Sequence, residues 1–210
     1  MCFYWKKYRK YVDAMEKEKT KNELDFLKAQ FNPHFLFNSI NSIYGHIDKG
    51  NPTARNMLIT FSEMLRYQLH ECKVDTINID KEIYYIRNYV ALQQRRKEED
   101  LYIKLNITPE VKGFHIAPLL FSPFIENAFK YASCSDAENK VEIGLDKRSD
   151  LLLFQALNTR DKSNATFIKH SGTGINKARR RLELLYPDQH ELQIDDAEKF
   201  YLVTLKIQLF

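Results

Sequence analysis

One histidine lies on a predicted helix face whose character changes along its length. At helical spacing, the face runs from apolar to polar residues through Leu24, Leu27, Phe31, His34, Asn38 and Asn41. Pro33 removes a backbone N–H, so we expect a kink just before His34. A neutral imidazole is a good nucleophile toward phosphorus near neutral pH, and Asn38 would hold a water or phosphate oxygen beside it. Periodicity alone favours a plainer alternative, a helix histidine with capping asparagines.

A second group of polar side chains shares one face of a helix expected from about Pro118 to Ser133. Glu126, Asn127 and Lys130 meet because they are spaced by three and four residues. The other face is expected to bury Phe121, Phe124, Ile125 and Ala128. A carboxamide oxygen is a hard ligand for Mg²⁺, and a lysine supplies positive charge for phosphate. By spacing alone, an exposed Glu126–Lys130 ion pair is the simpler explanation.

Two glycines, Gly172 and Gly174, open a further helix that is expected from Gly174 to Tyr186. Glycine permits close approach to the backbone, and a helix N-terminus offers free N–H groups to phosphate. A lone pair of glycines is weak evidence, because most such pairs are turns and caps. The inward residues of this helix are expected to be Ile175, Ala178, Leu182 and Leu185. Arg180 and Arg181 are expected to form only a solvated face.

The predicted elements indicate helices first and an α/β layer afterwards. A helix from about Tyr8 to Lys49 is interrupted by Pro33, and Asn51 and Pro52 start a second helix that runs to about Glu71. The second helix carries an apolar stripe of Leu58, Phe61, Leu65 and Leu69. Later elements are a helix over 81–98 and strands over 101–108, 140–146, 151–157, 190–194 and 200–209. One hairpin cannot cover both apolar stripes, so the pattern favours a dimeric four-helix bundle.

Positive charge is concentrated near the start of the chain. The 210 residues have a net charge of +4, and the segment Lys6–Lys21 holds seven bases and three acids, so the remainder is neutral on balance. A neutral body argues against nucleic-acid binding.

The aromatic run Phe3–Trp5 before these bases is typical of the cytoplasmic exit of a membrane helix, although a solvated helix start explains it equally. The longest stretch without Asp, Glu, Lys or Arg, Ala29–Ile47, is 19 residues long and rich in polar residues, so it does not supply the about 20 predominantly apolar residues of a membrane helix. Three distant cysteines indicate a reducing cytoplasm without structural zinc.

Several strings of the chain resemble one known family. QFNPHFLFNSIN at Gln30–Asn41 closely resembles the phosphoacceptor box of LytS/YehU-type sensor histidine kinases. FSEMLRY at Phe61–Tyr67 and YVALQ at Tyr89–Gln93 are also similar to that family. The stretch Ile116–Tyr131 looks like the N box of the GHKL-type ATP-binding domain, and Ser171–Tyr186 resembles its G box. The resemblance spans roughly residue 24 to the C-terminus.

The resemblance implies a role for each candidate residue. His34 would accept phosphate with Asn38 beside it, and Glu126 is a candidate to polarise His34, since no acid follows this histidine directly. The residues implied for ATP and Mg²⁺ are Asn127 for the metal, Lys130 for phosphate, and Gly172 and Gly174 for the nucleotide. Residues 159–171 would form a lid over it.

One departure from the family pattern affects the base of the nucleotide. Kinases of this superfamily usually carry Asp-x-Gly-x-Gly after the strand that corresponds to 151–157, and here that place reads Asn158-Thr159-Arg160-Asp161. Asn158 thus stands where an Asp usually reads adenine, and no glycine follows. The amide carbonyl can still accept from the adenine amine.

We therefore predict an α+β chain with a dimerising helical hairpin and a two-layer ATP-binding domain of the histidine kinase/Hsp90-like type. The expected parts are a basic juxtamembrane segment over 1–21, a dimerisation and phosphoacceptor region over 22–80, and the ATP-binding domain over 81–210. The resemblance implies Mg-ATP-dependent phosphorylation of His34 and onward transfer to a response regulator, often of LytTR type. It also implies a homodimer within a membrane-anchored parent, at the cytoplasmic face of the bacterial inner membrane.

Two alternatives remain open. A pseudokinase, which binds nucleotide weakly or not at all, is favoured by Asn158 and the missing glycines. An ATPase or protein kinase without a histidine acceptor is opposed by the intact string around His34.

Overall fold

The computed structural model describes residues 40–41, 43–48, 50–96, 101–132, 139–160 and 172–209. The chain divides into two compact units, Met1–Ser62 and Glu63–Phe210. The expected helix kink, His34, Asn38, the basic segment and most of the proposed lid lie outside the described residues. No helix within the described ranges combines the length and the apolar character that crossing a membrane requires.

Helix α3 (Pro52–His70) begins as the sequence predicts. The side chain of Asn51 accepts a hydrogen bond from the Ala54 N–H at 3.0 Å, which satisfies one of the free donors of the first turn. Pro52 occupies the first helical position, where its missing N–H has no cost. The helix is followed by a single 3-10 turn, η1 (Glu71–Lys73).

The last turns of α3 pack on α4 (Ile79–Arg96) within the second unit. Their small core is formed by Met64, Tyr67, Ile77 and Tyr85. The rings of Tyr67 and Tyr85 are stacked, with their centroids 5.0 Å apart. The predicted stripe of α3 is therefore not its buried face, because the buried residues of the helix, Met64 and Tyr67, lie outside that stripe and Phe61 within it is 45% exposed.

A five-stranded sheet forms the main layer of the second unit, in the order β2-β4-β5-β7-β6. Its strands are β2 (Leu101–Ile107), β4 (Asn139–Arg148), β5 (Leu151–Thr159), β6 (His190–Asp196) and β7 (Phe200–Gln208). β2 and β4 are parallel, and the other neighbours are antiparallel. Two short strands that the sequence did not indicate, β1 (Ile77–Asn78) and β3 (His115–Ile116), pair separately.

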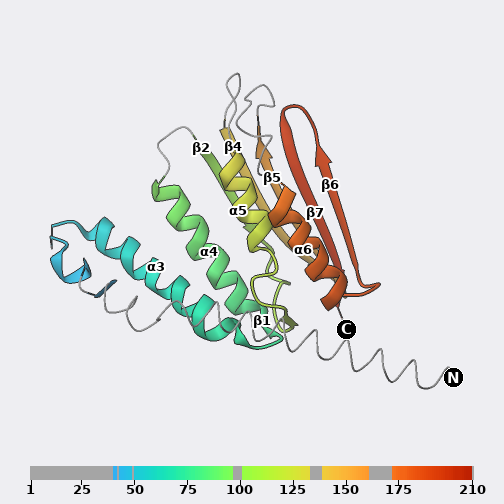
Figure 1. Ribbon diagram of the computed structural model, residues 1–210, viewed down its shortest axis with the longest axis horizontal. Coiled ribbons are helices and arrows are strands. Elements are labelled where there is room, and N and C mark those ends of the chain that lie inside the picture. Colours follow the sequence, from blue (N-terminus) through green and yellow to red (C-terminus); the bar gives the residue numbers. More distant parts are fainter. Residues whose placement is uncertain are drawn as a thin grey trace. The chain divides into compact units, whose positions relative to one another are not determined.

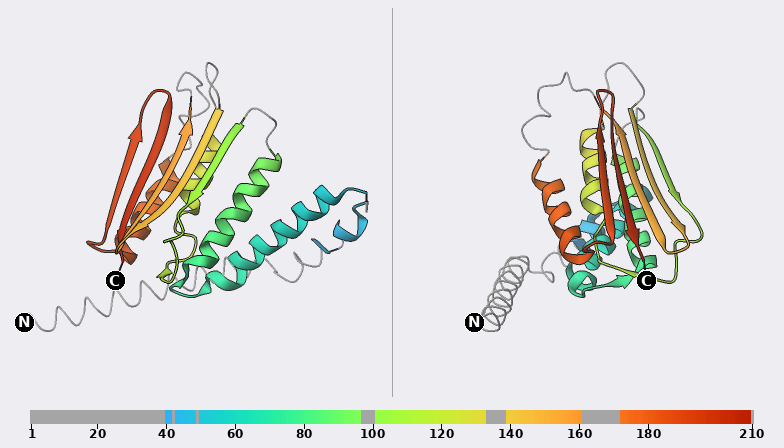
Figure 2. Two further views of the ribbon diagram at one scale, coloured as in Figure 1. Left: turned by 180° about the vertical axis from the view of Figure 1, so that it is seen from behind. Right: turned by 90° about the vertical axis from the view of Figure 1, so that its right-hand side faces the viewer.

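Helices α4, α5 (Ser122–Tyr131) and α6 (Gly172–Leu185) cover one face of this sheet (Figures 1 and 2). Alternate strand residues point into this layer, as the buried positions Leu152, Phe154 and Ala156 of β5 show. Phe154 stacks on Phe121 at 4.7 Å between ring centroids and also meets Phe124 at 6.1 Å. The predicted α+β class and two-layer architecture are confirmed.

One predicted helix begins four residues too early. The sequence favoured a start near Pro118, whereas α5 begins at Ser122. Leu119 has a left-handed backbone, with φ of 54°, and a residue in that conformation cannot belong to a right-handed helix. The inward residues Phe121, Phe124, Ile125 and Ala128 are nevertheless buried as predicted.

Replacing Phe154 by Ala should destabilise the second unit by about 3–5 kcal/mol, because Phe121, which precedes α5, and Phe124 of α5 both pack against its ring. Urea unfolding of the two proteins measures the difference. Leu151→Ala on the same strand, where the side chain is 37% exposed, is the control and should change stability by less than about 1 kcal/mol. Equal losses in both variants would contradict this description of the core.

Candidate functional site

Helix α5 brings three predicted site residues to one face. Glu126 and Lys130 are exposed and Asn127 is half-buried, while the opposite face of the helix packs on the sheet. The ion pair expected in the plainer alternative is not formed between Glu126 and Lys130. Instead, the Lys130 ammonium lies 4.9 Å from the ring centroid of Tyr131. Both charges therefore remain available to a ligand or another protein group.

Glu126 lies at the rim of a small hollow between α4 and α5. The hollow is lined by Tyr85, Ile86, Tyr89, Ser122, Ile125 and Glu126. Neighbouring protein atoms exclude water from one side of the carboxyl group and raise the pKa of Glu126 above its usual value. A carboxylate with a raised pKa is a better base than an ordinary glutamate.

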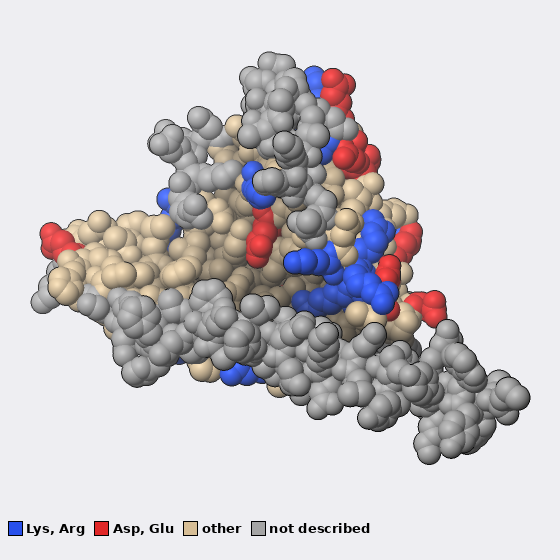
Figure 3. Space-filling model, viewed as in Figure 1, with Lys and Arg blue, Asp and Glu red and all other residues tan. Residues whose placement is uncertain are grey.

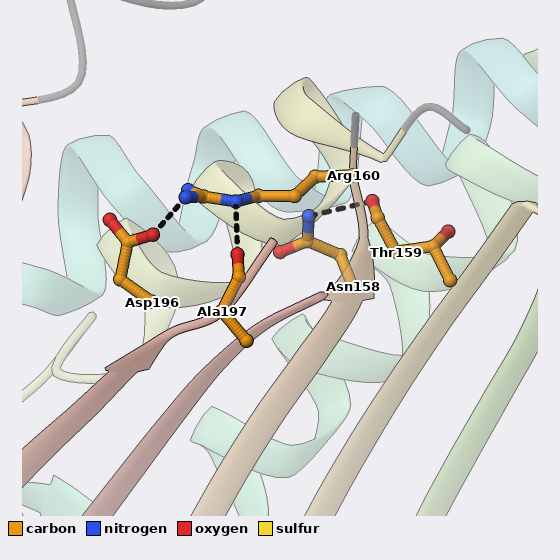
Figure 4. Close-up of polar contacts among 5 residues, drawn as sticks. All are labelled: Asn158, Thr159, Arg160, Asp196 and Ala197. Carbon is orange, nitrogen blue, oxygen red and sulfur yellow. Dashed lines mark hydrogen bonds and ion pairs between the residues drawn. The ribbon is translucent and has the colours of Figure 1, made fainter. Parts of the chain in front are cut away.

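Asn158 ends the inward-facing row of β5 and is fully buried, at 0% exposure. Its Nδ2 donates a hydrogen bond to the carbonyl oxygen of Thr159 at 3.0 Å (Figure 4). Because a carbonyl can only accept, this bond fixes the orientation of the amide. The other amide atom, Oδ1, is buried without a hydrogen-bond partner. Such an acceptor requires an explanation, and a donor supplied by a ligand is one.

Arg160 occupies a position where the family pattern has glycine, and its side chain extends to the turn between β6 and β7 (Figure 4). Its Nε donates to the carbonyl oxygen of Ala197 at 3.2 Å, and its Nη2 pairs with Asp196. Its guanidinium also lies 5.4 Å from the ring centroid of Tyr201. The long side chain is therefore held by β6 and β7.

Helix α6 includes both glycines in its first turn, two residues earlier than predicted. A side-chain carbon at Gly174 would meet no atom within 4 Å, so protein packing does not require glycine there. The open space leaves room for a ligand near the free N–H groups of the helix N-terminus. Basic side chains gather over α6 on the face shown in Figure 3, and Lys177, Arg179 and Arg180 are exposed.

Two expectations about α6 are wrong. Arg181 is not a solvated residue, because its guanidinium donates to the carbonyl oxygens of Pro118 at 2.5 Å and Leu119 at 3.3 Å. Leu185, expected to face inward, is 44% exposed near the helix end. Arg180 does lie on the surface, where it pairs with Glu183, and Ile175, Ala178 and Leu182 are buried as predicted.

The sequence analysis missed Glu82, a fully buried carboxylate on α4. Its Oε2 accepts hydrogen bonds from the Tyr67 hydroxyl at 2.5 Å and from the Leu119 N–H at 2.9 Å. Burial raises the pKa of Glu82, although both hydrogen bonds and the nearby Arg181 oppose that change. An acidic residue in the first turn of a helix normally lies in solvent near the helix N-terminus, so nothing in the sequence marked it.

The site residues thus fall into two groups. Glu126, Asn127 and Lys130 share α5, which packs through Phe124 on Phe154 of the strand that ends near Asn158. His34 and Asn38 lie outside the described residues. Within the described ranges, no group of three or more His, Cys, Asp or Glu side chains could hold a metal ion.

Comparison with known proteins gives one family. The model of the family described as Histidine kinase matches residues 22–101. The Sensor histidine kinase/phosphatase LytS of Staphylococcus aureus (strain MRSA252) is 30% identical over 161 residues, which are 76% of this chain and 26% of that protein. The Sensor protein LytS of Staphylococcus saprophyticus is 26% identical over 184 residues, covering 82% of this chain and 31% of that protein. The chain spans about a quarter to a third of the length of these curated relatives.

Among solved structures, the histidine kinase domain of the blue-light activated histidine kinase from Erythrobacter litoralis EL346 is similar. The match covers 81% of this chain and 93% of that chain, with 14% identity and a TM-score of 0.49. The family assignment rests on the sequence similarity to the LytS proteins.

Glu82→Gln should remove a pH dependence of stability. Because the pKa of Glu82 is raised in the folded state, its ionised form is disfavoured there, and stability is lost as the pH rises from the ordinary carboxyl range near 4.5 through the raised pKa. The free energy of unfolding of the parent, measured relative to Glu82→Gln, should therefore fall as the pH rises above the ordinary carboxyl range. Urea unfolding at several pH values measures this difference, and a constant or rising difference would contradict the burial of the charged group.

Proposed function

We propose that this chain, which belongs to the family of LytS-type sensor histidine kinases, binds ATP in its second unit and transfers the γ-phosphoryl group to His34. The observation that carries this proposal is the buried Oδ1 of Asn158, an acceptor without a protein partner. This oxygen would accept a hydrogen bond from the adenine amine. A kinase that uses ATP needs a site that recognises adenine, and this oxygen would contribute to one.

The phosphate end of ATP would lie along α5 and the start of α6. Lys130 has an ammonium that forms no ion pair within the described part of the chain, and Gly174 borders open space. Gly172 and Gly174 stand where free N–H groups would receive phosphate oxygens. Asn127 would hold Mg²⁺ through its carboxamide oxygen, together with phosphate oxygens and water. When bound, the metal neutralises the charge that develops on the phosphates.

Phosphoryl transfer would form a bond between an imidazole nitrogen of His34 and the γ-phosphorus. The bond between that phosphorus and the β–γ bridging oxygen would break, and ADP would leave. Glu126 would polarise the imidazole, and its raised pKa suits that role. Asn38, one helical turn after His34, would hold a phosphate oxygen. Catalysis would depend mainly on positioning and charge neutralisation.

We also propose the partners that a kinase of this family requires. The exposed side chains Ile59 and Phe61 of α3, at 43% and 45%, support a homodimer formed through the helices around Asn51 and Pro52. A response regulator with a LytTR domain would accept the phosphoryl group on an Asp. The basic, aromatic start of the chain supports a membrane-anchored parent with this part at the cytoplasmic face of the bacterial inner membrane.

A pseudokinase is the second candidate, because Asn158 and Arg160 replace the usual Asp and Gly. The contacts of Arg160 with Asp196 and Ala197 weigh against it, since a side chain held by β6 and β7 is not free to fill the nucleotide site. The neutral amide at 158 weakens the hydrogen bond to adenine without removing it.

Incubation of the chain with Mg²⁺ and γ-labelled ATP should place label on His34, and the label should be lost in acid and retained in base. His34→Gln should remove it, and Asn127→Ala should reduce it to background while the protein stays folded, because this half-buried side chain faces away from the core. His46→Gln, at an exposed histidine of the same unit, is the control and should keep the label. Label that persists in His34→Gln would refute the acceptor, and free phosphate without label would favour an ATPase.

Calorimetric titration should show that ATP binds more tightly than GTP, whose base presents an oxygen where adenine presents an amine. Asn158→Ala should weaken ATP by up to about tenfold, because a neutral hydrogen bond contributes about 0.5–1.5 kcal/mol. Asn158→Asp should strengthen it, because hydrogen bonds to charged groups contribute about 1.5–3 kcal/mol.

The control for this titration is Gln155→Ala, at an exposed position of the same strand. It should leave ATP affinity unchanged. Equal affinities for ATP and GTP, unaffected by Asn158→Ala, would show that this asparagine only ends a strand.

A further inference from the structure

The segment 117–119, which precedes α5, is held by side chains of α4 and α6 and by Tyr186, just after α6. The Ala117 N–H donates to the Tyr186 hydroxyl at 2.9 Å, next to the end of α6. Arg181 of α6 donates to the carbonyl oxygens of both Pro118 and Leu119. Glu82 of α4 accepts from the Leu119 N–H. Three consecutive residues are therefore fixed by partners that lie far away in the sequence.

Leu119 is the residue that needs this support. Its φ of 54° is unfavourable for leucine, because the side chain approaches the backbone in the left-handed region. Both of its backbone polar groups are hydrogen-bonded: the N–H donates to Glu82, and the carbonyl oxygen accepts from Arg181. We call this pair of side chains, Glu82 and Arg181, the clamp. A strained residue persists only where its surroundings determine it strongly, and such residues concentrate at functional sites.

We infer that Glu82 is a positioning residue for the nucleotide site, which with Arg181 holds Leu119 in its left-handed conformation and so sets where α5 begins. This inference rests on the function proposed for α5. A helix transmits a displacement of its first turn along its length, so a change at Leu119 moves Asn127 and Lys130 together. A buried carboxylate is a poor choice for stability alone, because well-packed apolar residues often stabilise such a site equally or better.

The same carboxylate oxygen connects this clamp to α3. The Tyr67 hydroxyl donates to Glu82 Oε2 from the last turns of α3, beside the Leu119 N–H that donates to the same atom. The Tyr67 ring is fixed by its stack on Tyr85. Tyr67 therefore makes the position of Glu82, and through it the start of α5, depend on the end of α3.

Tyr67→Phe and Tyr84→Phe are a matched pair of test variants. Each removes one tyrosine hydroxyl that donates to a glutamate between α3 and α4, and the Tyr84 hydroxyl donates to Glu63 at 2.6 Å without involving Glu82. Tyr67→Phe should weaken ATP binding by about three- to tenfold and shift the NMR signal of the Asn127 side-chain amide. Tyr84→Phe should do neither. Equal effects of the two variants on both measurements would overturn the inference.

Glu82 itself is tested by a conservative and a severe variant of the whole chain. Glu82→Ala should weaken ATP by about tenfold or more, whereas Glu82→Gln, whose amide oxygen can accept both hydrogen bonds, should stay within about threefold of the parent. A folded Glu82→Ala protein with parental affinity would overturn the inference. If Glu82→Ala does not fold, the tyrosine pair decides.

A parent that binds no ATP would refute the proposed function instead. The inference would then be decided by hydrogen exchange of the Leu119 amide, which Tyr67→Phe should accelerate and Tyr84→Phe should not. Unchanged exchange in both variants would overturn it.

Discussion

The buried carboxylate of Glu82 is the constraint on which the arrangement of the second unit depends. One of its oxygens accepts hydrogen bonds from both the Tyr67 hydroxyl and the Leu119 N–H. It therefore joins α3, α4 and the segment before α5 at a single point. Hydrophobic packing positions helices only approximately, whereas hydrogen bonds to one buried atom fix distance and direction. The left-handed Leu119 and the late start of α5 follow from this contact, and the face with Glu126 and Asn127 follows from that start.

The other half of the site depends on the end of β5. Asn158 continues the inward row that begins with Leu152 and Phe154, so the packing of that strand under α5 also places the amide. Two residues after Asn158, Arg160 follows the end of the strand, and its side chain is held at the β6–β7 turn by Asp196 and Ala197. A long cation in place of glycine is thereby accommodated through contacts with neighbouring strands, which the sequence pattern around Asn158 does not reveal.

Much of this structure could be predicted because its signals are local. The alternation in β2, the Asn51 cap and the periodic apolar residues of α5 each act within a few positions. The errors came from long-range contacts. Arg181 looked like a surface residue because its carbonyl partners lie about 60 residues away in the chain, and Glu82 looked like an ordinary helix-start acid for the same reason. For the candidate site, spacing grouped Glu126, Asn127 and Lys130, but only the fold revealed the unpartnered Asn158 oxygen.

The central claim is that a fixed α5 and the free amide oxygen of Asn158 together receive ATP. A crystal structure of the chain with Mg²⁺ and a non-hydrolysable ATP analogue tests it most directly, through the distance between the adenine amine nitrogen and Asn158 Oδ1. Our account predicts a distance of about 3 Å, with the Leu119 N–H still bonded to Glu82. An adenine bound elsewhere, or an amine out of hydrogen-bond reach of Asn158, would contradict it.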